Sequence, residues 1–313
     1  MHTTTPSSLN RNTVSRIVVS TLKGISQVVL IENAMTGFVI LIAILISSVS
    51  LAIISLLSAL IGTVIGIGLR ADTESVNRGL MGYNSVLTGM ALTLFLTGGD
   101  RWIIALVGAA VAAIFSAAMN HIMKNTGLPS LTFPFIVLSW FFLLTSYRLT
   151  SFKISSALVP QDLTHWSLNI QGEINWLNGM MKGSGQIFFL DYSLSGILLY
   201  AAFFIAGWRY GLYAIIGNAA AIITAYFLGG EHSLISMGLY GYNAILTIIA
   251  VSIVFKEHQR YALLTGVIAA CLTIPITASI DTWLLPYGLP ALTMPFVLCS
   301  WLFLAARKML PSL

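Results

Sequence analysis

Long apolar stretches separated by short polar connections dominate the hydropathy pattern of this chain. Ten stretches are candidates for crossing a bilayer as helices. The first five lie near residues 36–49, 50–69, 79–96, 102–123 and 131–147, and the second five near 193–207, 208–228, 238–255, 261–280 and 292–306. The pattern predicts an all-α polytopic membrane protein with two sets of five spans.

Three blocks of sequence recur in the same order in both sets, at an offset of 159 to 161 residues. Shared helix-packing residues could explain one such block, but three in the same order indicate duplication. Because each half holds an odd number of spans, the second half enters the bilayer from the opposite face, so the repeats are inverted. The matched blocks are GISQVVLIENAMTG and GSGQIFFLDYSLSG, LMGYNSVLTGMALTLFL and LYGYNAILTIIAVSIVF, and LPSLTFPF and LPALTMPF.

Inverted repeats in membranes place a substrate path at the pseudo-two-fold axis, lined by broken or half-spanning helices. In LPSLTFPF, Pro129 suits a helix start, and the Thr132 hydroxyl can cap free backbone N–H groups. We therefore expect half-spanning helices that start near Thr132 and Thr293, and two more that start near Gln27 and Gln186. Their four N-termini would converge from opposite faces around a central pore.

Composition and charge agree with a membrane protein. Of the 313 residues, 57% are hydrophobic and 8% are charged, against about 25% charged in soluble domains. The net charge of +5 comes from scattered single residues that form no basic stripe, so no nucleic-acid partner is expected. Placing the N- and C-termini in the cytoplasm satisfies the positive-inside rule. The inner side then holds Arg11, Arg16, Lys23, Arg70, Arg78, Lys124, Arg209, Lys256, Arg260, Arg307 and Lys308, and the outer side Arg101, Arg148, Lys153 and Lys182.

The domain organisation follows from the duplication. Residues 1–23 lack the apolar core of a secretory signal and are expected to form a cytoplasmic segment. Residues 24–148 form the first transmembrane repeat, 149–182 an extracytoplasmic linker, and 183–313 the second, inverted repeat. Trp166 and Trp176 in the linker suit an interfacial position. The two cysteines, Cys271 and Cys299, lie in apolar runs and are expected to pack in the interior.

The doubled LPxxTxPF, the doubled Gly-Tyr-Asn-x-x-Leu at 82–87 and 241–246, and the Gly-x-x-Gln sequences at Gly24 and Gly183 resemble the urea transporter family. The likeness runs from Gly24 to the C-terminus. It implies a multi-pass protein of the cell membrane, of the bacterial inner-membrane type. It further implies a homotrimer in which each protomer conducts urea passively through its own pore, past oxygen ladders flanked by aromatic slots.

The family's pore positions fall on twelve residues of this chain. One departure is Leu30, which stands where the family pattern usually has phenylalanine, and tyrosine at the slot positions 83 and 242 is a milder one. The resemblance assigns the polar contacts to Gln27, Gln186, Thr132 and Thr293, the apolar lining to Val28, Ile187, Leu87 and Leu246, and the slots to Leu30, Phe189, Tyr83 and Tyr242.

The residue types suit a flat neutral amide, because uncharged oxygens can replace the water that urea loses. Purely structural interpretations stay open. The threonines could serve as N-caps, the glutamines could form interhelical contacts, and the tyrosines could be packing residues. Glu32 and Asp191 are the only matched acids, and we expect them to be solvated or capping. The alternative function is an ion- or proton-coupled carrier that uses this pair. No metalloprotease or nucleophile motif is present, so no enzyme, metal or cofactor is expected.

Overall fold

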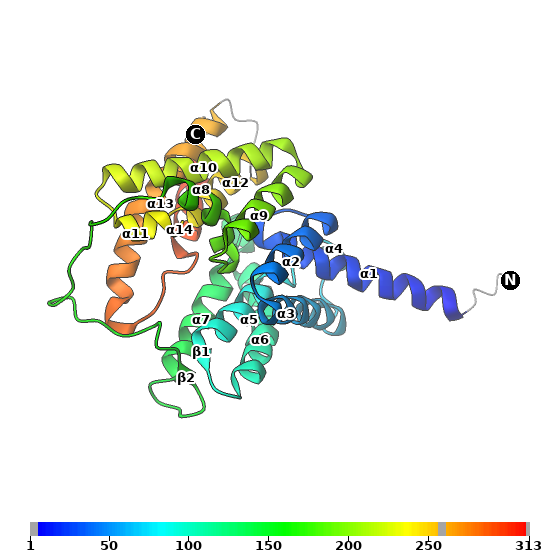
Figure 1. Cartoon of the computed structure of the whole chain (residues 1–313). Helices are drawn as coiled ribbons and strands as arrows, with labels where there is room; N and C mark the ends of the chain where they lie inside the picture. The colour runs from blue at the N-terminus through cyan, green and yellow to red at the C-terminus, as the bar shows by residue number, and fades with distance from the viewer. Residues whose placement is uncertain (1–5, 256–260, 311–313) are drawn as a thin grey trace.

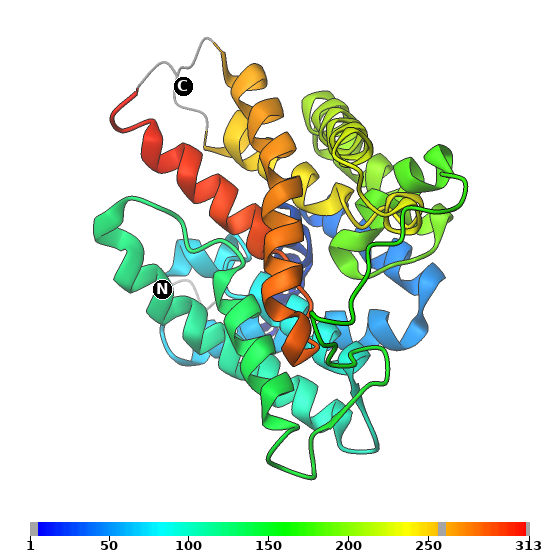
Figure 2. The ribbon, with the colours of Figure 1, turned by 90° about the vertical axis from the view of Figure 1, so that its left-hand side faces the viewer.

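The structure is a computed structural model that describes residues 6–255 and 261–310, with side chains described from Thr13 onward (Figure 1). Lys256, Arg260 and the side chain of Arg11, which were counted above as inner charges, lie outside the described part. The first-half helices and the second-half helices form two lobes that meet along the middle of the molecule (Figures 1 and 2). The N-terminal part of α1 projects from this body (Figure 1).

Each lobe contains the same series of helices. The first has α1 (Pro6–Ser26), α2 (Ala34–Ser47), α3 (Val49–Gly68), α4 (Thr73–Asn77), α5 (Tyr83–Phe95), α6 (Arg101–Met123) and α7 (Phe133–Thr145). The second has α8 (Trp176–Gly185), α9 (Ser193–Ala206), α10 (Trp208–Phe227), α11 (His232–Ser236), α12 (Gly241–Ile249), α13 (Ala262–Leu284) and α14 (Met294–Ala306). The pairs α2/α9, α3/α10, α6/α13 and α7/α14 match in length at 14, 20, 23 and 13 residues.

Short elements complete the matched series. Single 3₁₀ turns follow α1, α6, α8 and α13, at Gln27–Val29, Lys124–Thr126, Gln186–Phe188 and Leu285–Tyr287, and a π-helical turn at Ala250–Val254 extends α12. Strands β1 (Leu96–Thr97) and β2 (Lys153–Ile154) pair antiparallel, with Leu96 opposite Ile154. This pairing attaches the start of the linker to the end of α5.

The apolar stretches all contain helices, but not all of these helices cross a bilayer. Within the described residues, four are long and apolar enough: Val49–Gly68, Arg101–Thr126, Trp208–Phe227 and Ala262–Tyr287. Two bent pairs, α1 with α2 and α8 with α9, each turn by 74° at a break. Helices α5, α7 and α14 have 13 residues each, about 20 Å of rise against about 30 Å of hydrocarbon. These three predicted spans are therefore half-length helices, because hydropathy does not register where irregular backbone replaces the first turns.

Reciprocal contacts relate the two lobes by a pseudo-two-fold axis. The Trp140 indole N–H donates to the Pro290 carbonyl (2.9 Å), and its counterpart Trp301 donates to the Pro129 carbonyl (2.7 Å). Helices α2 and α9 exchange a second such pair: Ser195 Oγ donates to Ala43 O (2.8 Å), and Thr36 Oγ1 to Ala202 O (3.5 Å). In a two-fold interface, a residue of one half contacts a residue of the other half, and the two equivalent residues make the same contact in return. The duplication seen in the sequence is thus a symmetric packing.

Two matched glycines set how closely the bent pairs pack. A Cβ built on Gly37 would lie 1.9 Å from the Leu22 carbonyl oxygen, and one on Gly196 would lie 1.8 Å from the Met181 carbonyl oxygen. Helix α2 can therefore approach α1, and α9 can approach α8, only with glycine at these positions, as in other membrane helix contacts.

We expect Gly37→Ala to destabilise the protein by about 1–3 kcal/mol, since the obstructing atom is backbone and cannot rotate away. Thermal unfolding in detergent micelles measures the effect. The control is Gly68→Ala, whose Cβ would meet nothing within 4 Å and should leave stability unchanged or raise it by up to about 1 kcal/mol. Equal stability of both variants would show that the α1–α2 contact is loose.

Candidate functional site: the meeting point of two loops

The loops that precede α7 and α14 meet at a pair of threonines. Each loop follows a left-handed glycine, Gly127 (φ 64°) or Gly288 (φ 60°), and has no regular structure before the helix begins. The Oγ1 atoms of Thr132 and Thr293 lie 2.7 Å apart, a hydrogen bond in which either can donate. Both residues are buried, and they come from positions 161 residues apart in the chain. The two predicted threonines therefore form one site.

The threonines occupy N-cap positions but make no capping bond through their side chains. Their hydroxyls face each other instead, so the expectation that Thr132 caps free N–H groups was wrong. The prolines inside the first helical turn are Pro134 and Pro295, rather than Pro129. Pro134 suits that position because its missing N–H would have no helical partner there. The N-terminal ends of α7 and α14 thus converge on the hydroxyl pair.

Tyrosine and asparagine side chains hold the last carbonyl of each loop. Tyr83 Oη donates to Leu131 O (2.8 Å), and Tyr242 Oη donates to Leu292 O (2.7 Å). Asn84 and Asn243, the following residues, each donate a longer bond of 3.3 Å to the same carbonyls. Tyr83 lies at the first residue of α5 and Tyr242 at the second residue of α12, so the Gly-Tyr-Asn motif delivers both donors together.

The glutamines lie at helix ends, which corrects the prediction that helices begin there. Gln27 follows the last residue of α1, and Gln186 follows the last residue of α8, each in a single 3₁₀ turn. Apolar continuity suggested a helix start, but the chain breaks after this turn and reverses. Two helix N-termini, those of α7 and α14, therefore meet at the threonine pair, where four had been predicted.

Matched backbone carbonyls orient the two glutamine side chains. Gln27 Nε2 donates to Arg78 O and Gln186 Nε2 donates to Met237 O, both at 2.9 Å. Since only the amide nitrogen can donate to a carbonyl, these bonds fix which atom is which. The carboxamide oxygen of each glutamine then remains an acceptor.

Non-glycine residues with positive φ cluster at this centre. Among the described residues, five have such backbone, and four of them form matched pairs: Leu30 (61°) with Phe189 (59°), and Leu131 (50°) with Leu292 (53°). The left-handed region costs a non-glycine residue of order 1 kcal/mol or more and persists where surrounding contacts impose it. Leu30 and Phe189 end the 3₁₀ turns that carry the glutamines.

The predicted apolar lining residues are buried around the same turns. Val28, Ile187, Leu87 and Leu246 are each at most 1% exposed. Phe189 packs edge-on against Phe95 and Phe135, with ring centroids 5.8 and 6.4 Å apart. Leu30 and Phe189 are only partly buried, as expected for residues beside an opening.

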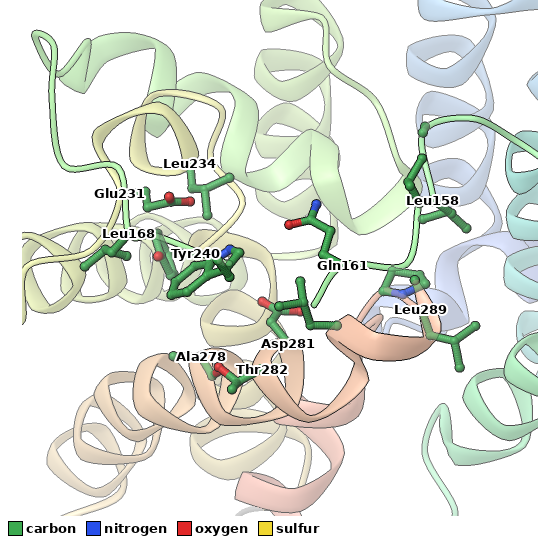
Figure 3. Close-up of a pocket in the computed structure, with 16 residues that line it drawn as sticks. Leu158, Gln161, Leu168, Glu231, Leu234, Tyr240, Ala278, Asp281, Thr282 and Leu289 are labelled. Atoms are coloured by element: carbon green, nitrogen blue, oxygen red, sulfur yellow. The ribbon is translucent and has the colours of Figure 1, made fainter. Parts of the chain in front are cut away.

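Two cavities share a few matched lining positions, but only one of them, the Arg78 cavity, is lined by predicted pore residues. The Arg78 cavity, of about 540 Å³, is lined by Gln27, Leu30, Tyr83 and Leu131, among others, together with Arg78 and Glu32. The Asp281 cavity, of about 460 Å³, contains Asp281, Glu231, Tyr240 and Gln161 (Figure 3). A few lining positions of the two cavities are equivalent, such as Asn120 and Asp281, which are 161 positions apart, and Pro129 and Pro290.

The two cavities differ in charge. In the Arg78 cavity, the guanidinium of Arg78 balances the carboxylate of Glu32, with Nε to Oε2 at 2.9 Å. In the Asp281 cavity, two carboxylates are present, and none of its lining residues is a lysine or arginine. Met237 replaces Arg78 and Asp281 replaces Asn120 at the matched positions. The pseudo-symmetry therefore holds for the backbone and the centre, but not for the electrostatics of the cavities.

The matched acids are exposed partners in ion pairs. Glu32 bonds Lys23 (2.9 Å) and Arg78, with 37% of its side chain exposed, and Asp191 bonds Lys182 (2.8 Å), with 64% exposed. Asn33, rather than Glu32, caps α2 through its side chain. The solvated interpretation of these acids fits this placement.

Sequence reasoning missed three kinds of residue at the site. Trp140 and Trp301 hold the opposite loop, Asn84 and Asn243 support the tyrosines, and Asp281 with Glu231 makes one cavity acidic. The asparagines were visible as identical letters within a repeated block, and the tryptophans as identical letters five residues after the LPxxTxPF blocks. The acids were not, because their counterparts in the first half differ or lie outside the blocks compared.

Comparison with known proteins places the chain among transporters. The model of the family described as "Urea transporter" matches residues 18–308. The chain is similar to proteins named "Urea transporter 1" from Ovis aries, Capra hircus and Mus musculus. Each is 27% identical over 297 residues, which cover 93% of this chain and 77% of the relative.

The exposed ion pairs predict that Glu32→Gln lowers stability by less than about 1 kcal/mol, the usual range for surface salt bridges. The difference from wild type should shrink further between low and high salt as the charges are screened. Thermal unfolding at two ionic strengths checks this, with Asp191→Asn as the matched variant. A large, salt-independent loss in Glu32→Gln alone would mean that the carboxylate is desolvated in the folded protein.

Proposed function

Because this chain belongs to the urea transporter family, we propose that it carries urea passively across a membrane, through a path that crosses the threonine pair. The observation that carries the proposal is the Thr132–Thr293 hydroxyl pair, at 2.7 Å, where two half-spanning helices begin. The Arg78 and Asp281 cavities are its two mouths, and the halves 24–148 and 183–313 are the inverted repeats, joined by the linker 149–182.

The chemistry of the centre suits a neutral amide. Urea has four N–H donors and one carbonyl acceptor, and losing its water uncompensated would cost several kcal/mol. The two glutamine oxygens and the two threonine hydroxyls supply neutral partners. The hydroxyl pair uses one hydrogen for its internal bond, so one hydrogen stays available to a permeant carbonyl. Neutral partners also bind weakly enough for release.

The remaining predicted residues form the walls of the path. Val28, Ile187, Leu87 and Leu246 give a dry apolar lining, while Phe189, Tyr83 and Tyr242 contact the flat faces of the solute. Leu30 makes one wall aliphatic. The apolar lining and the compact polar centre favour a planar molecule over hydrated ions.

Cations are disfavoured at the centre by the two convergent helices. Each N-terminus of α7 and α14 carries about half a positive charge, and neither threonine caps it through its side chain. The sequence predicted four such ends, and two give a smaller electrostatic barrier than four would. It still acts on ammonium and protons and leaves urea unaffected.

We place the protein in the cell membrane, of the bacterial inner-membrane type, with both termini in the cytoplasm, and infer a homotrimer with one pore per protomer. The support is the resemblance to the family and the bias of positive charge. Large apolar side chains exposed on α3, such as Val49 (62%) and Ile53 (52%), suit contact with lipid or with another subunit.

Replacing a pore hydroxyl should slow transport without unfolding the protein. We expect Thr132→Val and Thr293→Val each to reduce urea flux about tenfold, the equivalent of about 1.4 kcal/mol for a lost hydrogen bond. Stopped-flow light scattering on proteoliposomes measures the flux, and Thr132→Ser serves as the control that keeps the hydroxyl. Wild-type flux in well-folded valine variants would remove the threonines from the path.

A passive path requires that urea only equilibrate. In proteoliposomes with an imposed pH or sodium gradient, we expect the internal urea concentration to reach and not exceed the external one, as measured with radiolabelled urea. Glu32→Gln and Asp191→Asn should behave alike, because their exposed ion pairs are not coupled to transport. Gradient-driven accumulation that is lost in either variant would establish the coupled carrier instead.

A further inference from the structure

The hydroxyl groups of Tyr83 and Tyr242 make bonds that an aromatic wall alone does not require. Each donates to the carbonyl of the residue directly before a pore threonine, at 2.8 and 2.7 Å. Tyr83 lines the Arg78 cavity, and Tyr242 is half-buried at the matched position of the other half. Each hydroxyl therefore lies beside the residue that precedes one of the two threonines.

The loop carbonyls are already engaged by the protein. Leu131 O accepts from Tyr83 Oη and, at 3.3 Å, from Asn84 Nδ2, while Leu292 O accepts from Tyr242 Oη and Asn243 Nδ2 at the same distance. A carbonyl oxygen offers two lone pairs. These two carbonyls are thus poor candidates for direct contact with a permeant.

Because of these bonds, the two tyrosine hydroxyl oxygens can only accept further hydrogen bonds. A phenol has one hydrogen, and a carbonyl partner can only accept, so the hydrogen of each tyrosine is committed to the loop. Any further bond to Oη must therefore come from a donor. The tyrosine oxygen takes over the acceptor role that the loop carbonyl would otherwise have toward the path.

Resting on the proposed function, we propose that Tyr83 and Tyr242 determine specificity through their hydroxyl oxygens, which accept N–H groups of urea on either side of the threonine pair. Urea carries an amino group at both ends and presents N–H in either orientation. Formamide, also flat and neutral, carries one amino group and one C–H end. The hydroxyls therefore favour urea over amides with a single amino group.

The test is the ratio of urea to formamide permeability in proteoliposomes, measured by stopped flow. Tyr83→Phe and Tyr242→Phe each keep the ring and remove the acceptor. We expect each to lower the ratio about fivefold, within the range of one hydrogen bond. Because the ratio is taken within one preparation, it does not depend on the fraction of active protein.

Tyr200→Phe is the matched control. Tyr200 Oη donates to Met180 O (3.0 Å) and accepts from Asn218 Nδ2 (2.8 Å), the same tyrosine, asparagine and carbonyl combination away from the two cavities. Its loss should affect stability and leave the ratio unchanged.

Two results would overturn the inference. An unchanged ratio in both Tyr83→Phe and Tyr242→Phe, with urea flux retained, would leave the hydroxyls with a structural role only and the proposed function intact. A wild-type protein that passes no more urea than empty liposomes would instead refute the proposed function and the inference with it. A lowered ratio in one or both variants, with Tyr200→Phe unchanged, supports the proposal.

Discussion

Every backbone carbonyl deep in a membrane protein needs a donor, because no bulk water is available to supply one. The two loops before α7 and α14 abandon helical bonding at this depth, and side chains take its place. Trp301 and Trp140 donate to the Pro129 and Pro290 carbonyls. Tyr83 and Tyr242 do the same for the buried carbonyls of Leu131 and Leu292. Without these bonds the loops could not stay irregular, and the two threonines could not be brought together.

The tryptophans also join the halves. Each indole reaches the loop of the other repeat, so neither loop is satisfied within its own half. Close helix contacts at Gly37 and Gly196 fix the bent pairs against the same centre. The pseudo-two-fold axis is thus a consequence of bonds that each half cannot complete alone. Away from this axis, the two halves need not carry the same charged side chains, and the linings of the Arg78 and Asp281 cavities differ in charge.

The predictions that succeeded were those based on hydropathy and on residues repeated in both halves. The helical membrane class, the duplication and the family follow from apolar runs and repeated blocks, and the structure brings Thr132 and Thr293 into contact. The predictions that failed concerned backbone direction. Gln27 was placed at the start of a helix and lies just past the end of one, because an apolar run that turns by 74° looks continuous in sequence.

The sequence by itself determined that this chain is a duplicated helical membrane protein with uncharged polar residues at matched positions, because composition and repetition are properties of the letters. The tertiary structure decided which atoms those residues present. It turned the Thr132 hydroxyl toward Thr293 instead of its own helix, and it committed the Tyr83 hydrogen to Leu131. It also gathered Asp281 and Glu231 into one cavity. These side-chain orientations and groupings depend on contacts between segments far apart in the chain, so a local sequence pattern does not predict them.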